Sequence, residues 1–157
     1  MLVDSLHRNA YRFGHLLARQ WWRLRRPRGH GVAVAVWWRE RLLVVRPSYR
    51  PGYDLPGGGL HPGEEPRQGA VRELAEELAV AVPRLELADL GLFSFTLDHR
   101  RIRETLFAWQ PAAEPALRID RREIVWAGFV RPDVLAAAQV TPSVRHALRR
   151  PPALTAR

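Results

Sequence analysis

Apolar residues along the chain follow two spacings, and each spacing predicts a type of element. Residues 32–38 and 42–45 are continuous apolar runs, which are typical of buried strands. The charged segment 39–41 between them predicts a tight turn, so we expect a hairpin. The stretch 47–63 is rich in proline and glycine. We expect it to be mostly loop, with room for one short strand at 53–55.

A helical spacing follows the glycine-rich stretch. Glu65 and Pro66 can start a helix, because proline suits the first turn, and Pro83 would end it. Within this segment the apolar residues that would form the buried stripe are Ala70, Val71, Leu74 and Leu78.

The rest of the chain alternates between predicted strands and helices. We expect strands at 87–97, 102–110 and 123–130, a polar turn at 98–101, and helices at 132–138 and 142–148. Mixed strands with a central and a terminal helix predict an α/β fold in which helices pack against a sheet.

The first 30 residues have a different character from the rest. Leu2, Leu6 and Ala10 begin an apolar stripe of helical spacing that continues to Leu24, and arginines occupy the other faces. The helix should stop near Pro27, and Gly29 and Gly31 are expected to form a hinge. We therefore divide the chain into a basic amphipathic helical arm, 1–30, and a domain, 31–157.

Composition narrows the function classes. The chain has no cysteine, which excludes disulfides, thiolate nucleophiles and cysteine-bound zinc. All 25 basic residues are arginine, which excludes a P-loop because that motif needs lysine. The arm holds seven arginines and one aspartate, or +6 of the net +9. No apolar run reaches the roughly 18 to 20 residues that span a bilayer, so we expect a cytoplasmic protein.

A cluster of carboxylates on the central helix is the strongest chemical feature. Glu73, Glu76 and Glu77 are spaced i, i+3 and i+4, so they project from one helical face. Like charges this close repel unless a cation lies among them, and either an arginine or a hard metal ion could supply it. A glycine-rich loop at 55–59 and Glu64 precede the helix, which predicts a cleft beside the cluster.

The segment 58–80 resembles the Nudix box, which runs Gly, five residues, Glu, seven residues, Arg-Glu, an aliphatic, any residue, Glu-Glu, any residue, Gly, an aliphatic. The matching residues are Gly58, Glu64, Arg72, Glu73, Leu74, Glu76, Glu77 and Val80. Ala79 departs from the pattern, because the family has glycine there. If that residue takes a left-handed conformation, alanine costs about 1 kcal/mol.

This resemblance implies a fold and an activity. The fold would be a Nudix-like α/β/α sandwich with a mixed β-sheet. The activity would be pyrophosphohydrolysis: cleavage of a phosphoanhydride bond in a nucleoside diphosphate derivative or a nucleoside triphosphate. Resemblance also assigns Glu73, Glu76 and Glu77 as ligands of Mg²⁺ or Mn²⁺, for which carboxylate oxygens are suitable.

The roles of three other charged residues are less directly implied. Glu64 would support the metal site from the loop side or cap the helix. Arg72 would pair with a carboxylate of the cluster and orient it, as its counterpart does in the family. Glu123, before the third late strand, is the outside candidate for a general base, although an ordinary loop acid has the same appearance.

Substrate contacts are expected from the segments before the helix. Arg46 and Arg50 could bind phosphates, since a guanidinium forks onto them, although arginine is also a common surface residue. The backbone of Gly57, Gly58 and Gly59 could approach the substrate closely. Aromatic residues that could stack on a base or form half-buried core are Trp37, Trp38, Tyr49 and Tyr53.

A different class of function stays open. The arm over 1–30 could bind RNA or a membrane surface, with the Nudix scaffold catalytically secondary. It could also pack on the domain or across a homodimer. The intact set Glu73, Glu76 and Glu77 favours the enzyme, because binding alone has no need of metal ligands.

Overall fold

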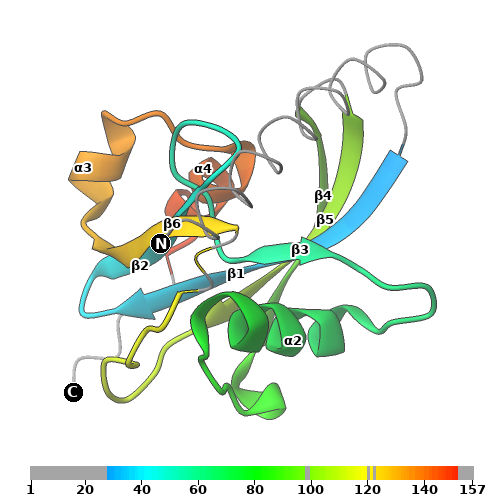
Figure 1. Ribbon diagram of the computed structural model, residues 1–157, viewed down its shortest axis with the longest axis horizontal. Coiled ribbons are helices and arrows are strands. Elements are labelled where there is room, and N and C mark those ends of the chain that lie inside the picture. Colours follow the sequence, from blue (N-terminus) through cyan, green and yellow to red (C-terminus); the bar gives the residue numbers. More distant parts are fainter. Residues whose placement is uncertain (1–27, 98–99, 120, 122, 152–157) are drawn as a thin grey trace.

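The computed structural model describes residues 28–97, 100–119, 121 and 123–151. Its elements include six strands, and the central helix α2 follows the third of them (Figure 1). In chain order they are β1 (Arg28–Trp38), β2 (Arg41–Pro47), β3 (Gly57–Gly59), α2 (Pro66–Leu78), the 3-10 turn η1 (Arg84–Glu86), β4 (Ala88–Leu97), β5 (Arg100–Trp109), β6 (Ile124–Val130), α3 (Pro132–Ala136) and α4 (Pro142–Leu148).

The strands form one mixed sheet with β1 at its centre. The order is β4-β5-β1-β2-β6, and β3 pairs with the first half of β1. The pairing of β1 with β5 is parallel, whereas the other strand pairs are antiparallel. Gly31 therefore has two partners, Gly59 on β3 and Glu104 on β5.

Helices cover both faces of this sheet, as Figure 1 shows for α2 on one side and α3 and α4 on the other. Alternate residues of β1 explain the two layers, because successive side chains of a strand point to opposite faces. Val32, Val34 and Val36 pack in a core with α2. Ala33 and Ala35 belong to a second core with α3 and α4. The expected α/β/α sandwich is confirmed.

Three expectations about the strands were wrong. β1 begins at Arg28 rather than residue 32, so Gly29 and Gly31 are paired within the sheet and do not form a hinge. The glycines expected to form a loop make the short strand β3, because a glycine backbone can approach β1 closely. The strand expected at 53–55 is reduced to isolated bridges of Tyr53 and Asp54.

The helix expected over residues 1–27 lies outside the described residues, and so do positions 98 and 99 of the expected turn. The arm remains a prediction. Among the helices that the structure describes, none is long and apolar enough to cross a membrane.

Helix α2 has well-defined ends. The Glu65 side chain accepts a hydrogen bond from the Arg67 N–H, so Glu65 rather than Glu64 is the N-cap. Ala79 is the C-cap, with φ 54° and ψ 32°, and its N–H bonds back to Ala75. Ala79 thus adopts the left-handed conformation that favours glycine.

Replacing Ala79 with glycine is expected to raise the free energy of unfolding by about 1 kcal/mol, since glycine adopts this conformation without a Cβ penalty. Ala75→Gly, at an exposed site inside the helix, should instead lower it by about 1 kcal/mol. Urea unfolding of both variants measures these two changes. Equal changes in the free energy of unfolding would contradict the strain at Ala79.

Candidate active site

The carboxylates of α2 lie directly against the glycine strand. The Gly57 N–H donates to Oε2 of Glu77 over 3.0 Å. Gly58 is so close to Glu73 that a Cβ there would lie 2.5 Å from the Glu73 Oε1. Glycine at position 58 is therefore what allows this carboxylate to reach the strand. The backbone of β3 and the acidic side chains of α2 are therefore in direct contact.

Arg72 donates several hydrogen bonds that connect α2 with the loop before it. Its Nε and one terminal nitrogen donate to the two oxygens of Glu64 over 2.8 and 2.9 Å. The other terminal nitrogen donates to Glu73 over 2.8 Å and to Glu76 over 3.1 Å. The Glu76 side chain is 59% exposed, so this last ion pair is weak. The internal pairing that resemblance implies for Arg72 is present in the geometry.

The electrostatics of the cluster are uneven. The hydrogen bonds from Arg72 lower the pKa of Glu64 to about 2. Burial raises the pKa of Glu73, with Arg72 opposing the shift. Burial also raises the pKa of Glu77 to about 8, and the charges of Glu73 and Glu123 add to it. The part of the cluster around Glu77 therefore lacks a positive charge.

A divalent cation fits this charge imbalance. Within the described ranges, no three acidic or histidine side chains already gather into a complete metal site, and Arg72 engages oxygens of Glu64, Glu73 and Glu76. The donor set nevertheless consists of carboxylate oxygens, which hard cations prefer. The single positive charge of Arg72 does not neutralise all of these carboxylates. The residues present would therefore accommodate a further cation.

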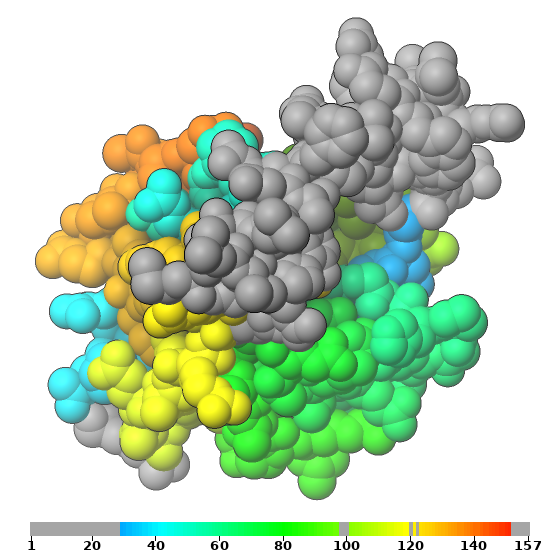
Figure 2. Space-filling view, in the orientation of Figure 1, coloured from blue at the N-terminus to red at the C-terminus, as the bar shows by residue number. Residues whose placement is uncertain are grey.

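Glu123 lies near the cluster although it comes from a distant segment. The chain before β6 lies beside α2 on the surface (Figure 2), where the Arg118 N–H bonds to the Leu78 carbonyl over 2.9 Å. Glu123 is exposed, and its charge raises the pKa of Glu73 and Glu77. Its role as a general base stays a prediction.

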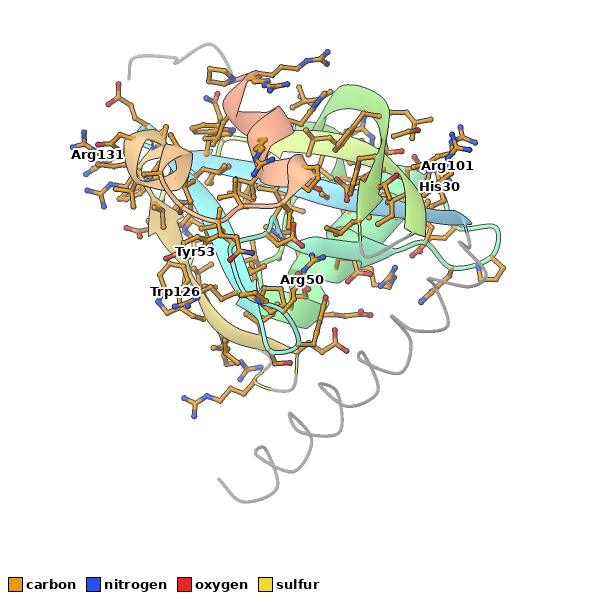
Figure 3. All side chains as sticks on the ribbon, turned by 90° about the horizontal axis from the view of Figure 1, so that it is seen from above. His30, Arg50, Tyr53, Arg101, Trp126 and Arg131 are labelled. Atoms are coloured by element: carbon orange, nitrogen blue, oxygen red, sulfur yellow. The ribbon has the colours of Figure 1, made fainter. Side chains whose placement is uncertain are left out.

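A pocket of about 240 Å³ opens beside the glycine strand. Gly57, Gly58 and Gly59 line it together with Arg50, which is ion-paired with Asp54. Arg46 does not line it. Its guanidinium lies 5.6 Å from the ring centre of Tyr53, and Tyr53 packs against Trp126, away from Arg50 (Figure 3). The structure brings Arg50 and the glycines together and places Arg46 elsewhere.

Sequence reasoning missed Glu104, which also lines this pocket. It lies on β5 between Ile102 and Leu106, the alternate residues that share its face of the strand. Its Oε1 is buried and has no hydrogen-bond partner among the described residues. A carboxylate between the apolar residues Ile102 and Leu106 on one face of β5 was the signal that could have found it.

Glu104 gives the stability of the protein a pH dependence. Burial raises its pKa from the ordinary 4.5 to about 7, and Ser143 and Arg50 oppose the shift. Between these values the folded state binds more protons than the unfolded state, so the free energy of unfolding falls as pH rises. Glu104→Gln should therefore stabilise the ligand-free protein by about 2 kcal/mol at pH 8, after allowance for solvent in the pocket.

This gain should become small near pH 4, where glutamate is mostly neutral in both states. Urea unfolding of the two proteins at pH 4, 6 and 8 measures it. A constant difference across this range would contradict the raised pKa of Glu104.

Comparison with known proteins gives a family match and a curated relative. The family model of the NUDIX domain matches residues 27–150. An RNA pyrophosphohydrolase of Dinoroseobacter shibae is 36% identical over 59 residues, which are 36% of this chain and 37% of that protein. The chain thus matches little more than a third of the length of this curated relative.

Solved structures share the fold. A MutT NUDIX hydrolase from Burkholderia pseudomallei matches with a TM-score of 0.70 and 21% identity, over 80% of this chain and 98% of that one. The NUDIX domain of Shewanella oneidensis NrtR, solved with ADP ribose, matches with a TM-score of 0.67 and 18% identity over 78% and 86%. The dihydroneopterin triphosphate pyrophosphohydrolase of E. coli matches with 0.66 and 20% over 77% and 92%.

Proposed function

Because this chain belongs to the Nudix family, we propose that it is a metal-dependent pyrophosphohydrolase. It cleaves the phosphoanhydride linkage of a nucleoside diphosphate derivative or a nucleoside triphosphate. The observation that carries the proposal is the contact of Glu73 and Glu77 with the glycine strand, at a place where negative charge exceeds positive charge.

The chemistry divides between a cation and the chain. When bound, Mg²⁺ or Mn²⁺ supplies a positive charge for the diphosphate and activates a water as nucleophile. Glu73, Glu76 and Glu77 would hold it, with Glu64 supporting the site from the loop. Arg72 orients Glu64 and Glu73 through charge-assisted hydrogen bonds. It acts on the carboxylates and not on substrate.

The glycine strand and Arg50 position the substrate. Gly57, Gly58 and Gly59 line the pocket, and Gly57 and Gly58 also contact Glu77 and Glu73, so we place the phosphates of a molecule bound in the pocket beside the cluster. Arg50 lines the same pocket and supplies positive charge on the substrate side. The names of two similar proteins support a substrate with a phosphoanhydride linkage. One is an RNA pyrophosphohydrolase, and the other is a pyrophosphohydrolase of a pterin triphosphate.

A substrate panel tests the proposal directly. The purified protein is incubated with nucleoside triphosphates, ADP-ribose, dinucleotides, nucleotide sugars and 5′-triphosphorylated RNA, with and without Mg²⁺ or Mn²⁺. Release of phosphate, pyrophosphate or nucleotide is measured. Turnover of one class that depends on the metal is the expected result, and no turnover of any member would contradict the proposal.

Residues 28–30 of the expected arm belong to β1, and residues 1–27 remain a candidate binding element. Their six arginines favour contact with an RNA backbone or an anionic membrane surface, and packing across a homodimer is the alternative. Deletion of residues 1–27 separates these proposals. Lost retention of RNA or of anionic liposomes would assign binding to the arm, and a change from dimer to monomer would assign assembly.

A further inference from the structure

The pocket beside the glycine strand lies against the sheet and is lined in part by apolar and aromatic side chains. Within this sheet, Gly31 lies between Gly59 of β3 and Glu104 of β5. The apolar and aromatic residues that line the pocket include Tyr49, Leu55, Phe95, Leu97 and Ile102. Its volume of about 240 Å³ is below the roughly 300 to 1,000 Å³ of drug-sized sites. It therefore suits one ring system and not a whole nucleotide.

Two buried polar atoms around this pocket have no partner among the described residues. One is the acceptor Oε1 of Glu104, and the other is the donor Nε of Arg50. A buried polar atom without a hydrogen bond is costly, and such atoms in folded proteins call for an explanation. Both residues line the pocket, so a ligand with a donor and an acceptor side by side would satisfy both atoms.

The two side chains are held in place by their other contacts. A hydrogen bond with Ser143 of α4 and the charge of Arg50 act on the Glu104 carboxyl. Arg50 pairs with Asp54, and Asp54 accepts hydrogen bonds from the Thr141 hydroxyl over 2.7 Å and from the Leu55 N–H over 2.9 Å. Side chains fixed in this way present their free atoms at defined positions, as a specific polar contact requires.

We propose that Glu104 determines substrate specificity by accepting hydrogen bonds from the ring N–H and the exocyclic amino group of a guanine-type heterocycle, while Arg50 donates to its neighbouring carbonyl. This inference rests on the proposed function, because it places the base of the nucleotide whose phosphates meet the α2 carboxylates. The rim of Gly57, Gly58 and Gly59 connects the two parts of the site.

The order of donors and acceptors favours guanine over other bases. A guanine edge presents a carbonyl, a ring N–H and an amino group in succession. This order matches Arg50 followed by the free Oε1 of Glu104 and by its second oxygen, which keeps a lone pair beside its hydrogen bond with Ser143. Adenine offers one amino group beside an unprotonated ring nitrogen and leaves the second acceptor unused. Uracil places a carbonyl against the carboxylate. A base that leaves buried polar atoms unpaired is rejected strongly.

Hydrolysis of GTP, ITP and ATP with Mg²⁺ tests the assignment, since ITP differs from GTP only by the amino group. We expect kcat/KM for GTP to exceed that for ITP by about 10-fold or more. In Glu104→Gln the GTP to ITP ratio should fall toward one, because an amide replaces one acceptor with a donor. Glu114→Gln, the same change at an exposed position, should keep the wild-type ratio.

Binding without metal separates this inference from the proposed function. Calorimetry with GMP and IMP should show tighter binding of GMP to the wild-type protein and similar binding of both to Glu104→Gln. If GMP is preferred but no nucleotide is hydrolysed, the specificity assignment stands and the proposed function fails. Absent binding, equal binding of GMP and IMP by the wild type, or a GMP preference that survives in Glu104→Gln overturns the assignment.

Discussion

Replacing Glu77 with glutamine is expected to lower kcat for the hydrolysed substrate by about 10³-fold, because the change removes a carboxylate that would hold the cation and its activated water. The fold should survive. Burial raises the pKa of Glu77 to about 8, so in the metal-free protein at neutral pH the acid is mostly neutral, as the amide is. The amide oxygen can still accept the Gly57 N–H.

Two measurements distinguish lost chemistry from lost structure. Urea unfolding should give Glu77→Gln a free energy of unfolding no lower than that of the wild type, and isothermal titration should show weaker Mn²⁺ binding. Glu114→Gln provides the matched control, since its side chain is exposed, and its activity should be unchanged. Full activity of Glu77→Gln at saturating Mg²⁺ would remove Glu77 from the catalytic assignment.

The substitution Gly57→Ala should lower the free energy of unfolding by about 3 kcal/mol or more. Gly57 has φ 150°, and a Cβ there would lie 2.2 Å from the Val32 carbonyl oxygen and 2.8 Å from the Ala33 Cα. These are backbone atoms of the central strand, which cannot rotate away. The pairing of β3 with β1 would therefore be broken, and the hydrogen bond to Glu77 would be lost with it.

Gly59→Ala is the matched comparison within the same strand. A Cβ at position 59 meets nothing within 4 Å, so its free energy of unfolding should change by less than about 1 kcal/mol. Urea unfolding and metal-dependent activity are measured for both variants. Similar stability of the two proteins would show that β3 can move away from β1 without cost, contrary to the close packing described above.

The sequence predicted the features that depend on local spacing. The i, i+3, i+4 positions of Glu73, Glu76 and Glu77 placed them on one face of a helix, and Pro66 marked its start. The sequence showed the departure at Ala79 but left its conformation open, and the backbone there is left-handed. These inferences hold because a helix is determined by residues a few positions apart.

Features that depend on distant pairing were not predictable in this way. Periodicity indicates that β1 and β5 are strands, but it does not give their register, which brings Glu104 beside Gly31. Periodicity also predicts a loop at Gly57, Gly58 and Gly59. These residues form a strand because their backbone approaches β1 closely enough to pair with it, and not because glycine favours strands. The same limit explains Arg46, which was grouped with Arg50 by sequence but contacts Tyr53.

The parallel pairing of β1 with β5 has a consequence for how the chain folds. Arg28 pairs with Arg101 and Val36 with Trp109, 73 positions later in each case. During synthesis the central strand emerges well before its parallel neighbour, so one of its edges stays unpaired until the whole of β5 has left the ribosome. Such long-range pairing slows folding and leaves a strand edge open to aggregation. Chains that terminate before Trp109 should therefore be insoluble or depend on chaperones.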